Sequence, residues 1–183
     1  MDLEPDAKDW TWVLTRPCTE CGFIASTFPR DRLGSAMVKM GPRWTFLLGR
    51  EGVAQRVDPA RWSVLEYGCH VRDVLVLYDE RLSLMLGAED AAFQNWDQDA
   101  TAVEQRYDLQ DPLEVTVQLV EAATQLGQHF SEVTADQWER TGHRSDGAIF
   151  TIQTFGQYLL HDLVHHLVDV GDLEGARSVQ STN

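Results

Sequence analysis

Apolar residues recur at spacings of three and four along four segments of the chain, and this periodicity predicts four amphipathic helices. In the clearest segment, Asp58-Pro59 supplies an N-cap followed by the residue best suited to the first helical position. The apolar stripe continues to Met85, and Gly87 is a natural stop. These features predict one helix of about 28 residues, roughly 42 Å long.

The other three segments have ends that are marked to different degrees. One opens at Asp111-Pro112, and another begins near Thr151 and stops at Gly171. The remaining segment, residues 33–48, has helical spacing but contains Gly41-Pro42. Because proline removes a backbone donor and clashes with the preceding turn, we expect this helix to kink or break there.

Four long amphipathic segments with few strand signals predict an all-α protein, a four-helix bundle in a single domain over residues 1–183. Residues 88–110 are too many for a tight hairpin, so we expect a long crossover connection between helices two and three, which lets them run parallel. Only residues 11–15 look β-like, and one helical turn is expected at 134–137. We interpret the domain as an N-terminal extension, the helical bundle and a C-terminal tail, over residues 1–27, 28–172 and 173–183.

The formal net charge of −14 at pH 7 restricts the partners that this protein is expected to have. A surface this negative repels phosphate backbones and anionic lipid headgroups, so we expect neither nucleic acid nor membrane binding. No apolar stretch approaches the roughly 18 residues that a membrane span needs. Met1–Lys8 lacks the pattern of a signal peptide, and the chain has three cysteines, so we expect a cytoplasmic protein without a disulfide framework.

Histidines are the most informative polar residues of the chain. His161 and His165 are four residues apart, so on a helix both rings project from one face, about 40° apart. This spacing lets one helix offer two imidazoles to one metal ion. A site with an open position usually has three protein ligands, and His70 on the second predicted helix is the best third candidate. We therefore predict one divalent metal ion on these three histidines.

Neighbouring residues refine this prediction. Four carboxylates lie near enough along the two helices to orient a ligand histidine or to bind directly: Glu66, Asp73, Asp162 and Asp169. His166 is about 140° from His161 around the helix and is not expected to join the same site. We interpret His129 as a helix-surface residue and His143 as a loop residue. The alternative for the predicted ligands is that they are ordinary core or surface histidines.

The sequence Cys18-Thr19-Glu20-Cys21-Gly22 has the spacing of half a zinc knuckle, but a second cysteine pair is missing. His143 or a carboxylate could complete such a site. A redox dithiol and an ordinary structural turn remain alternatives. Cys69 points away from His70 along its helix, and we interpret it as a packing residue.

Two motifs carry a resemblance to a known family. The sequence WSVLEYGCHVRDV at residues 62–74 resembles the second-helix motif of the DinB-like superfamily. The sequence RSDG at residues 144–147, then Phe150-Thr151, then HDLVHH at residues 161–166, resembles the approach to the fourth helix of that family and the helix itself. The match extends from about residue 44 to residue 172 in order and spacing. The extension around Cys18 and Cys21 lies outside it.

The resemblance implies a four-helix bundle with a crossed order of helices and a divalent metal ion, zinc or nickel. By position the ligands that it implies are His70, His161 and His165. The superfamily includes the metal-binding domain of mycothiol-dependent maleylpyruvate isomerase and the bacillithiol S-transferases. Since this chain ends soon after the fourth helix, we do not expect isomerisation itself. Related bundles often pair through helix faces, so a homodimer is a further hypothesis.

Three hypotheses about function follow. In the first, the protein is a metal-dependent S-transferase in which a low-molecular-weight thiol of the mycothiol or bacillithiol type is the cosubstrate and a small electrophile is the acceptor. In the second, it binds metal without catalysis, as a stress-response or sensor protein. In the third, it is a helical bundle whose histidines are incidental. Metal content separates the third hypothesis from the others, and turnover with a thiol separates the first from the second.

Overall fold

The structure is a computed structural model that describes residues 9–180. The expectation about Met1–Lys8 therefore lies outside the described residues. The seven α-helices of the described residues are α1 Leu33–Val38, α2 Met40–Leu48, α3 Val64–Gly87, α4 Gln98–Glu104, α5 Pro112–Glu132, α6 Ile152–Asp169 and α7 Leu173–Gln180. The three strands of this part are β1 Ala91–Phe93, β2 Thr141–Arg144 and β3 Ile149–Thr151. None of these helices is long and apolar enough to cross a lipid bilayer.

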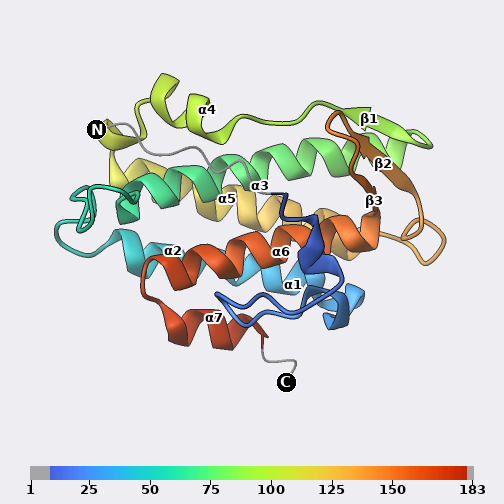
Figure 1. Ribbon diagram of the computed structural model, residues 1–183, viewed down its shortest axis with the longest axis horizontal. Helices are drawn as coiled ribbons and strands as arrows, with labels where there is room; N and C mark the ends of the chain where they lie inside the picture. The colour runs from blue at the N-terminus through green and yellow to red at the C-terminus, as the bar shows by residue number, and fades with distance from the viewer. Residues whose placement is uncertain (1–8, 181–183) are drawn as a thin grey trace.

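The predicted four-helix bundle is confirmed, with α1 and α2 together taking the place of one helix. The helices α3 and α5 point in the same direction, while α2 and α6 point the opposite way (Figure 1). Parallel α3 and α5 need a connection that returns along the bundle, and residues 88–110 provide it, with β1 and α4 along its length. The crossover connection that the length of this segment predicted is thus confirmed.

Capping side chains decide where the long helices begin. Asp111 accepts hydrogen bonds from the first turn of α5, and Thr151 forms a capping box with Thr154 at the start of α6, both as predicted. The predicted start of the helix after Asp58-Pro59 is wrong. There the main chain closes a turn, and the helix begins only after Ser63. The side chain of Ser63 accepts a hydrogen bond from the backbone N–H of Glu66, and the side chain of Glu66 accepts one from the backbone N–H of Ser63, which together form a capping box.

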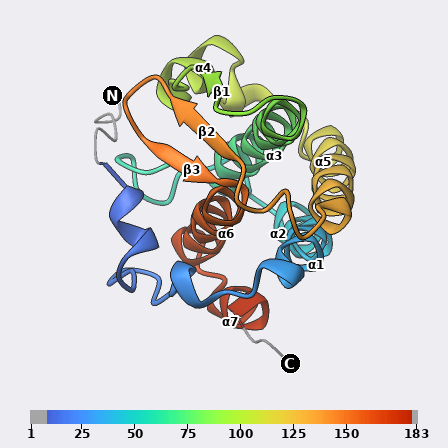
Figure 2. The same ribbon diagram turned by 90° about the vertical axis from the view of Figure 1, so that its right-hand side faces the viewer.

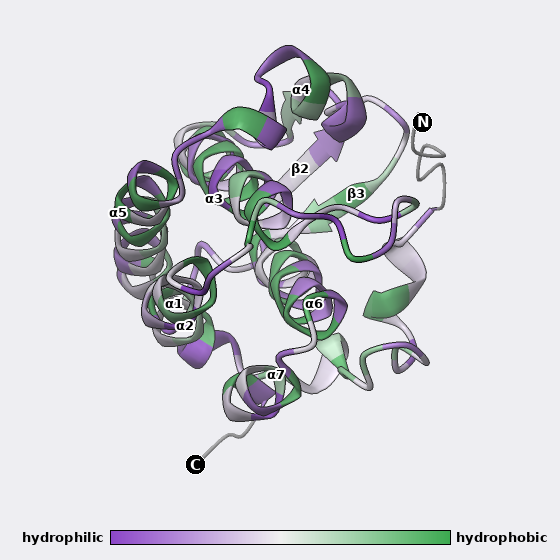
Figure 3. Ribbon diagram, turned by 90° about the vertical axis from the view of Figure 1, so that its left-hand side faces the viewer, coloured by the Kyte–Doolittle hydropathy of each residue, from purple (hydrophilic) through white to green (hydrophobic). Residues whose placement is uncertain are grey.

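The break predicted near Gly41-Pro42 separates α1 from α2 at Lys39. On either side of this break the helices pack on α5. At one crossing the backbones meet at two glycines, because a Cβ atom added to Gly34 would lie 2.4 Å from the carbonyl oxygen of Gly127. Close approach of this kind needs residues without side chains. The sides of the helices that face the core are hydrophobic and the outer sides are largely hydrophilic (Figure 3).

A small sheet, which the pattern of the sequence did not predict, lies at one end of the bundle. The strand β1 pairs in parallel with β2, and β2 pairs in antiparallel with β3. Each strand has only three or four residues, too few to give a clear alternating pattern. Residues 11–14, expected as β-like, form a 3-10 helix, and the helical turn expected at 134–137 is a turn without helix.

The N-terminal segment and α7 cover the bundle on the side of α6. Figure 2 shows α6 surrounded by α3, the α1–α2 pair, α7 and the N-terminal segment. Residues 173–180, interpreted from the sequence as a tail, form α7, which packs on α6 and buries Ala176 and Val179. Residues 11–14 and 25–27 also contact α6. Because α6 has neighbours on several sides, it can offer polar side chains to two different neighbours.

Candidate metal centres

The helix α6 carries two pairs of potential ligands that are both spaced by four residues. One pair is His161 and His165, and the other is Asp162 and His166. The two pairs are offset by one residue, which rotates them by about 100° around the helix axis. As a result, the first pair meets the N-terminal segment and the second pair meets α3. Within residues 9–180 these pairs belong to two separate groups of possible metal ligands.

The first group contains His70 from α3 with Asp162 and His166 from α6. The Nε2 atom of His70 lies 3.8 Å from one oxygen of Asp162, and the Nε2 atom of His166 lies 3.5 Å from the other. Four atoms of this group are buried without a hydrogen-bond partner in the described part of the chain: both ring nitrogens of His70, Oδ2 of Asp162 and Nε2 of His166. A cluster of unsatisfied polar atoms is costly unless something binds between them.

Neighbouring side chains hold the rings of this group in place. The Nδ1 atom of His166 donates a hydrogen bond to Asp169 at 3.0 Å, and Arg61 donates to the same carboxylate at 2.6 Å. The ring of His70 stacks on Trp96, with centroids 5.5 Å apart and planes 12° apart. His70 is buried, whereas the side chain of Asp162 is 35% exposed, so Asp162 is the most exposed member of the group.

Protonation in this group follows from burial and from the carboxylates. Burial lowers the pKa of His70, so its imidazole is neutral. Burial also opposes a charge on His166, but Asp162 and Asp169 outweigh it and raise the pKa of His166 to about 10. The same attraction keeps the pKa of Asp162 well below its usual range despite burial. Without a metal ion, the group therefore holds an internal ion pair.

The second group contains Cys18 and Cys21 from the N-terminal segment with His161 and His165 from α6. The Sγ atom of Cys18 lies 3.8 Å from Nδ1 of His165. The Nε2 atom of His161 is buried and has no hydrogen-bond partner in the described part of the chain. Burial lowers the pKa of His161 to about 4 and raises that of Cys21 to about 12. Without a metal ion, the imidazole of His161 and the thiol of Cys21 are therefore neutral near pH 7.

The segment from Cys18 to Phe23 folds into a tight turn that presents both thiols to α6. The backbone N–H of Cys18 donates to the carbonyl of Phe23, and that of Gly22 donates to the carbonyl of Cys18, both at 2.9 Å. Gly22 has a φ of 74°, in the region that favours glycine. On the far side of His165, Nε2 faces Glu20 at 3.5 Å and Asp169 at 3.9 Å.

The structure thus places the three predicted ligands in two groups rather than one. His161 and His165 lie together, but their partners are the two cysteines, whereas His70 lies with Asp162 and His166. The sequence predicts His166 outside the site of His70, because it lies about 140° around the helix from His161. The pair of Asp162 and His166 has the same spacing, so the sequence also carried the signal for this second pair.

The other polar residues named from the sequence have partners elsewhere. Glu66 pairs with Arg56 and caps α3, and Asp73 accepts hydrogen bonds from Arg72 and Tyr107. They therefore do not orient His70. His129 is a helix-surface residue paired with Asp79 at 2.6 Å, as interpreted, and Cys69 is buried in the core. His143, expected in a loop, lies in β2 and faces Asp90 at 3.4 Å.

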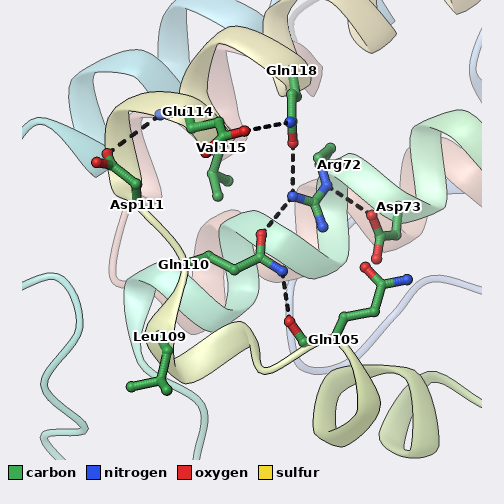
Figure 4. Close-up of a pocket in the computed structure, with 9 residues that line it drawn as sticks. All are labelled: Arg72, Asp73, Gln105, Leu109, Gln110, Asp111, Glu114, Val115 and Gln118. Carbon is green, nitrogen blue, oxygen red and sulfur yellow. Dashed lines mark hydrogen bonds and ion pairs between the residues drawn. The ribbon is translucent and has the colours of Figure 1, made fainter.

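A polar cavity of about 580 Å³ opens between α3, α5 and the crossover connection (Figure 4). It contains none of the residues of the two groups. Arg72 lies at its centre and donates hydrogen bonds to Gln110 and Gln118, so the guanidinium is already satisfied by the protein. The cavity therefore adds no candidate for the chemistry of the metal groups.

Comparisons with known proteins agree with this architecture. The family model described as the DinB superfamily matches residues 10–169. A search of curated proteins finds no match. Among solved structures, the chain resembles a protein described as "YfiT from Bacillus subtilis is a probable metal-dependent hydrolase with an unusual four-helix bundle topology". The TM-score is 0.69 and the identity 19%, over 79% of this chain and 85% of the other. At this identity the similarity concerns the fold.

Proposed function

The chain belongs to the DinB superfamily, and we propose that it is a metal-dependent enzyme that activates a low-molecular-weight thiol for transfer to an electrophile. The ion, zinc or nickel, would be held by His70, Asp162 and His166. The observation that carries this proposal is the cluster of four buried nitrogen and oxygen atoms on these three side chains, from two helices, that have no hydrogen-bond partner in the described part of the chain.

The donor atoms fit a divalent ion in type and in separation. Two imidazoles and one carboxylate are common ligands of zinc and related metals. Nitrogen and oxygen ligands at about 2.1 Å in a tetrahedral site lie about 3.4 Å from one another. The observed separations of 3.5 Å and 3.8 Å are close to this value and too long for good hydrogen bonds. The space between the side chains therefore suits an ion better than direct contacts.

Three protein ligands leave a position for a reactant. A bound divalent ion supplies a Lewis acid that favours the thiolate form of a thiol beside it. The residues of this chain provide the rest of the site: Asp169 fixes the ring of His166, Trp96 and Trp62 pack beside His70, and the partly exposed Asp162 marks the path by which a reactant would enter from solvent. A thiol of the mycothiol or bacillithiol type would enter by this path.

Hydrolysis is a second candidate, and a specific observation favours it. Two histidines and one carboxylate also form the metal site of zinc hydrolases. The similar solved structure is described as a probable metal-dependent hydrolase. In a hydrolase, water would take the place of the thiol beside the ion.

A non-catalytic protein of stress response or metal sensing would use the same ligands and would bind metal without turnover.

The test combines metal content with a thiol assay on untagged protein. Metal-loaded wild type is incubated with mycothiol or bacillithiol and a model electrophile, and in parallel with ester and amide substrates without thiol. We expect thiol consumption faster than with the free metal ion, and its loss in His70→Ala, while His143→Ala behaves like wild type. Cleavage of the ester or amide substrates without thiol consumption would contradict thiol transfer and support hydrolysis. Bound metal without any turnover would contradict both enzyme functions and support the non-catalytic one.

A further inference from the structure

We propose that Cys18, Cys21, His161 and His165 form a second metal site, a four-coordinate site of zinc type that fastens the N-terminal segment to α6. This site is separate from the one assigned to His70, and it stands whether or not the protein is an enzyme. It completes the Cys18-x-x-Cys21 motif with two histidines more than 130 positions away, which no spacing along the chain could reveal.

The geometry fits tetrahedral coordination by two sulfur and two nitrogen atoms. One ligand atom from each of the four residues lies within 4.8 Å of all the others. A sulfur at about 2.3 Å and a nitrogen at about 2.1 Å from the same ion lie about 3.6 Å apart in a tetrahedral site. The separation of 3.8 Å between Cys18 Sγ and His165 Nδ1 is close to that distance. The buried Nε2 of His161, unpartnered within residues 9–180, provides an independent sign of a missing ligand.

Local structure around the cysteines also suits a metal site. In the turn from Cys18 to Phe23, the glycine that follows the second cysteine has a positive φ, which lets the chain turn back and bring both cysteines to the same side. On the other side, Glu20 and Asp169 face the second ring nitrogen of His165, where a carboxylate would fix the ring for coordination.

The redox alternative fits these residues less well. Cys18 is only 1% exposed, so a partner dithiol has no direct access to it. A redox pair would also leave His161 and His165 without a role. In the metal site, binding of M²⁺ releases one proton from each thiol, and the two thiolates balance the charge of the ion without any change of oxidation state.

All four coordination positions would be filled by protein, which is typical of structural sites. The consequence is mechanical. The segment that carries Trp10 and the first 3-10 helix would be attached to α6 by bonds much stronger than its aromatic contacts with His161 and His165. Removal of the ion is expected to loosen residues 9–28 while the bundle stays folded.

Cobalt substitution tests this site in the full chain. Protein stripped with a chelator and reloaded with Co²⁺ is expected to bind two ions per chain and to show a near-ultraviolet thiolate-to-cobalt charge-transfer band. Cys21→Ser should bind one ion and lose most of the band, and Cys69→Ser, a buried cysteine outside the site, should match wild type. His70→Ala should bind one ion and keep the band, which separates this proposal from the proposed enzyme site.

Alkylation of the wild type provides a second readout that needs no variant. In zinc-loaded protein, mass spectrometry should find Cys18 and Cys21 protected, and addition of chelator should expose both to the reagent. Absence of the charge-transfer band in the wild type overturns the proposal, as does alkylation of Cys18 and Cys21 that is equal with and without zinc. If Cys21→Ser does not fold, the two wild-type measurements decide.

Discussion

Asp169 accepts a hydrogen bond of 3.0 Å from Nδ1 of His166, on the side of the ring opposite to the donor atom that faces His70 and Asp162. A carboxylate in this position fixes the ring and the tautomer that leaves Nε2 free for a metal ion. The same carboxylate lies 3.9 Å from Nε2 of His165. It therefore lies next to one histidine of each group.

Removal of this carboxylate should weaken metal binding without removing a ligand. We expect Asp169→Asn to raise the Kd for zinc at the site of His70, Asp162 and His166 by about 10–100-fold. A competition titration with a chromogenic chelator measures this Kd. Asp79→Asn is the matched control, because Asp79 lies on α3 well beyond His70 and pairs with His129, which belongs to neither group. An unchanged Kd in Asp169→Asn, in protein that keeps its helical circular dichroism, would show that Asp169 does not position His166.

The glycine pair between α1 and α5 should be sensitive to a single methyl group. In Gly34→Ala the new Cβ would lie 2.4 Å from the backbone oxygen of Gly127, so the two helices must move apart. Overpacking of this kind costs roughly 1–3 kcal/mol in the free energy of unfolding. Urea denaturation measures it. Gly87→Ala, where nothing lies within 4 Å of the new atom, is the control and should stay within about 0.5 kcal/mol of wild type.

The caps and apolar stripes made most of the bundle predictable from the sequence. Asp111 and Thr151 marked the starts of α5 and α6 correctly, because capping depends only on local residues. The start of α3 was misplaced because Asp58-Pro59 forms a turn, and the capping box of Ser63 and Glu66 defines the helix instead. The strands were missed since their pairing, rather than their local pattern, holds them together.

The site was predictable only in part, and the reason is geometric. The spacing of four residues occurs twice on α6, once from His161 and once from Asp162, and periodicity alone cannot say which pair faces α3. That choice depends on the packing of α6 among all its neighbours. The meeting of Cys18 with His165 depends on how the N-terminal segment crosses α6, which is a property of the tertiary structure.

The ion pair between Arg43 and Asp172 should make stability depend on acid pH. The hydrogen bonds from Arg43 hold the pKa of the buried Asp172 below its usual value of about 3.8, although burial opposes this. Because the pKa is lower in the folded state, the pair stabilises the fold above the pKa of the unfolded chain. This stabilisation is lost as pH falls from about 4 through the lower pKa of the folded state.

Asp172→Asn tests this relationship. The substitution should lower the free energy of unfolding at pH 7 by roughly 1–3 kcal/mol, because it replaces the buried carboxylate that accepts hydrogen bonds from Arg43 by a neutral amide. The fall in stability between pH 5 and about pH 3 should become shallower. Urea denaturation at several pH values measures both effects. Glu174→Gln is the control, because Glu174 is 92% exposed and lies as far as 4.0 Å from Arg43. A similar loss of stability in this variant would contradict the role given to the pair of Arg43 and Asp172.

Anomalous X-ray scattering from crystals of the zinc-loaded protein tests the central claim most directly. Data collected on either side of the zinc absorption edge locate the ion independently of any assumed ligands. We predict an anomalous peak about 2.0–2.2 Å from the facing donor atoms of His70, Asp162 and His166. An anomalous map without a peak between these three side chains, at a zinc concentration that saturates the protein in solution, would contradict the account.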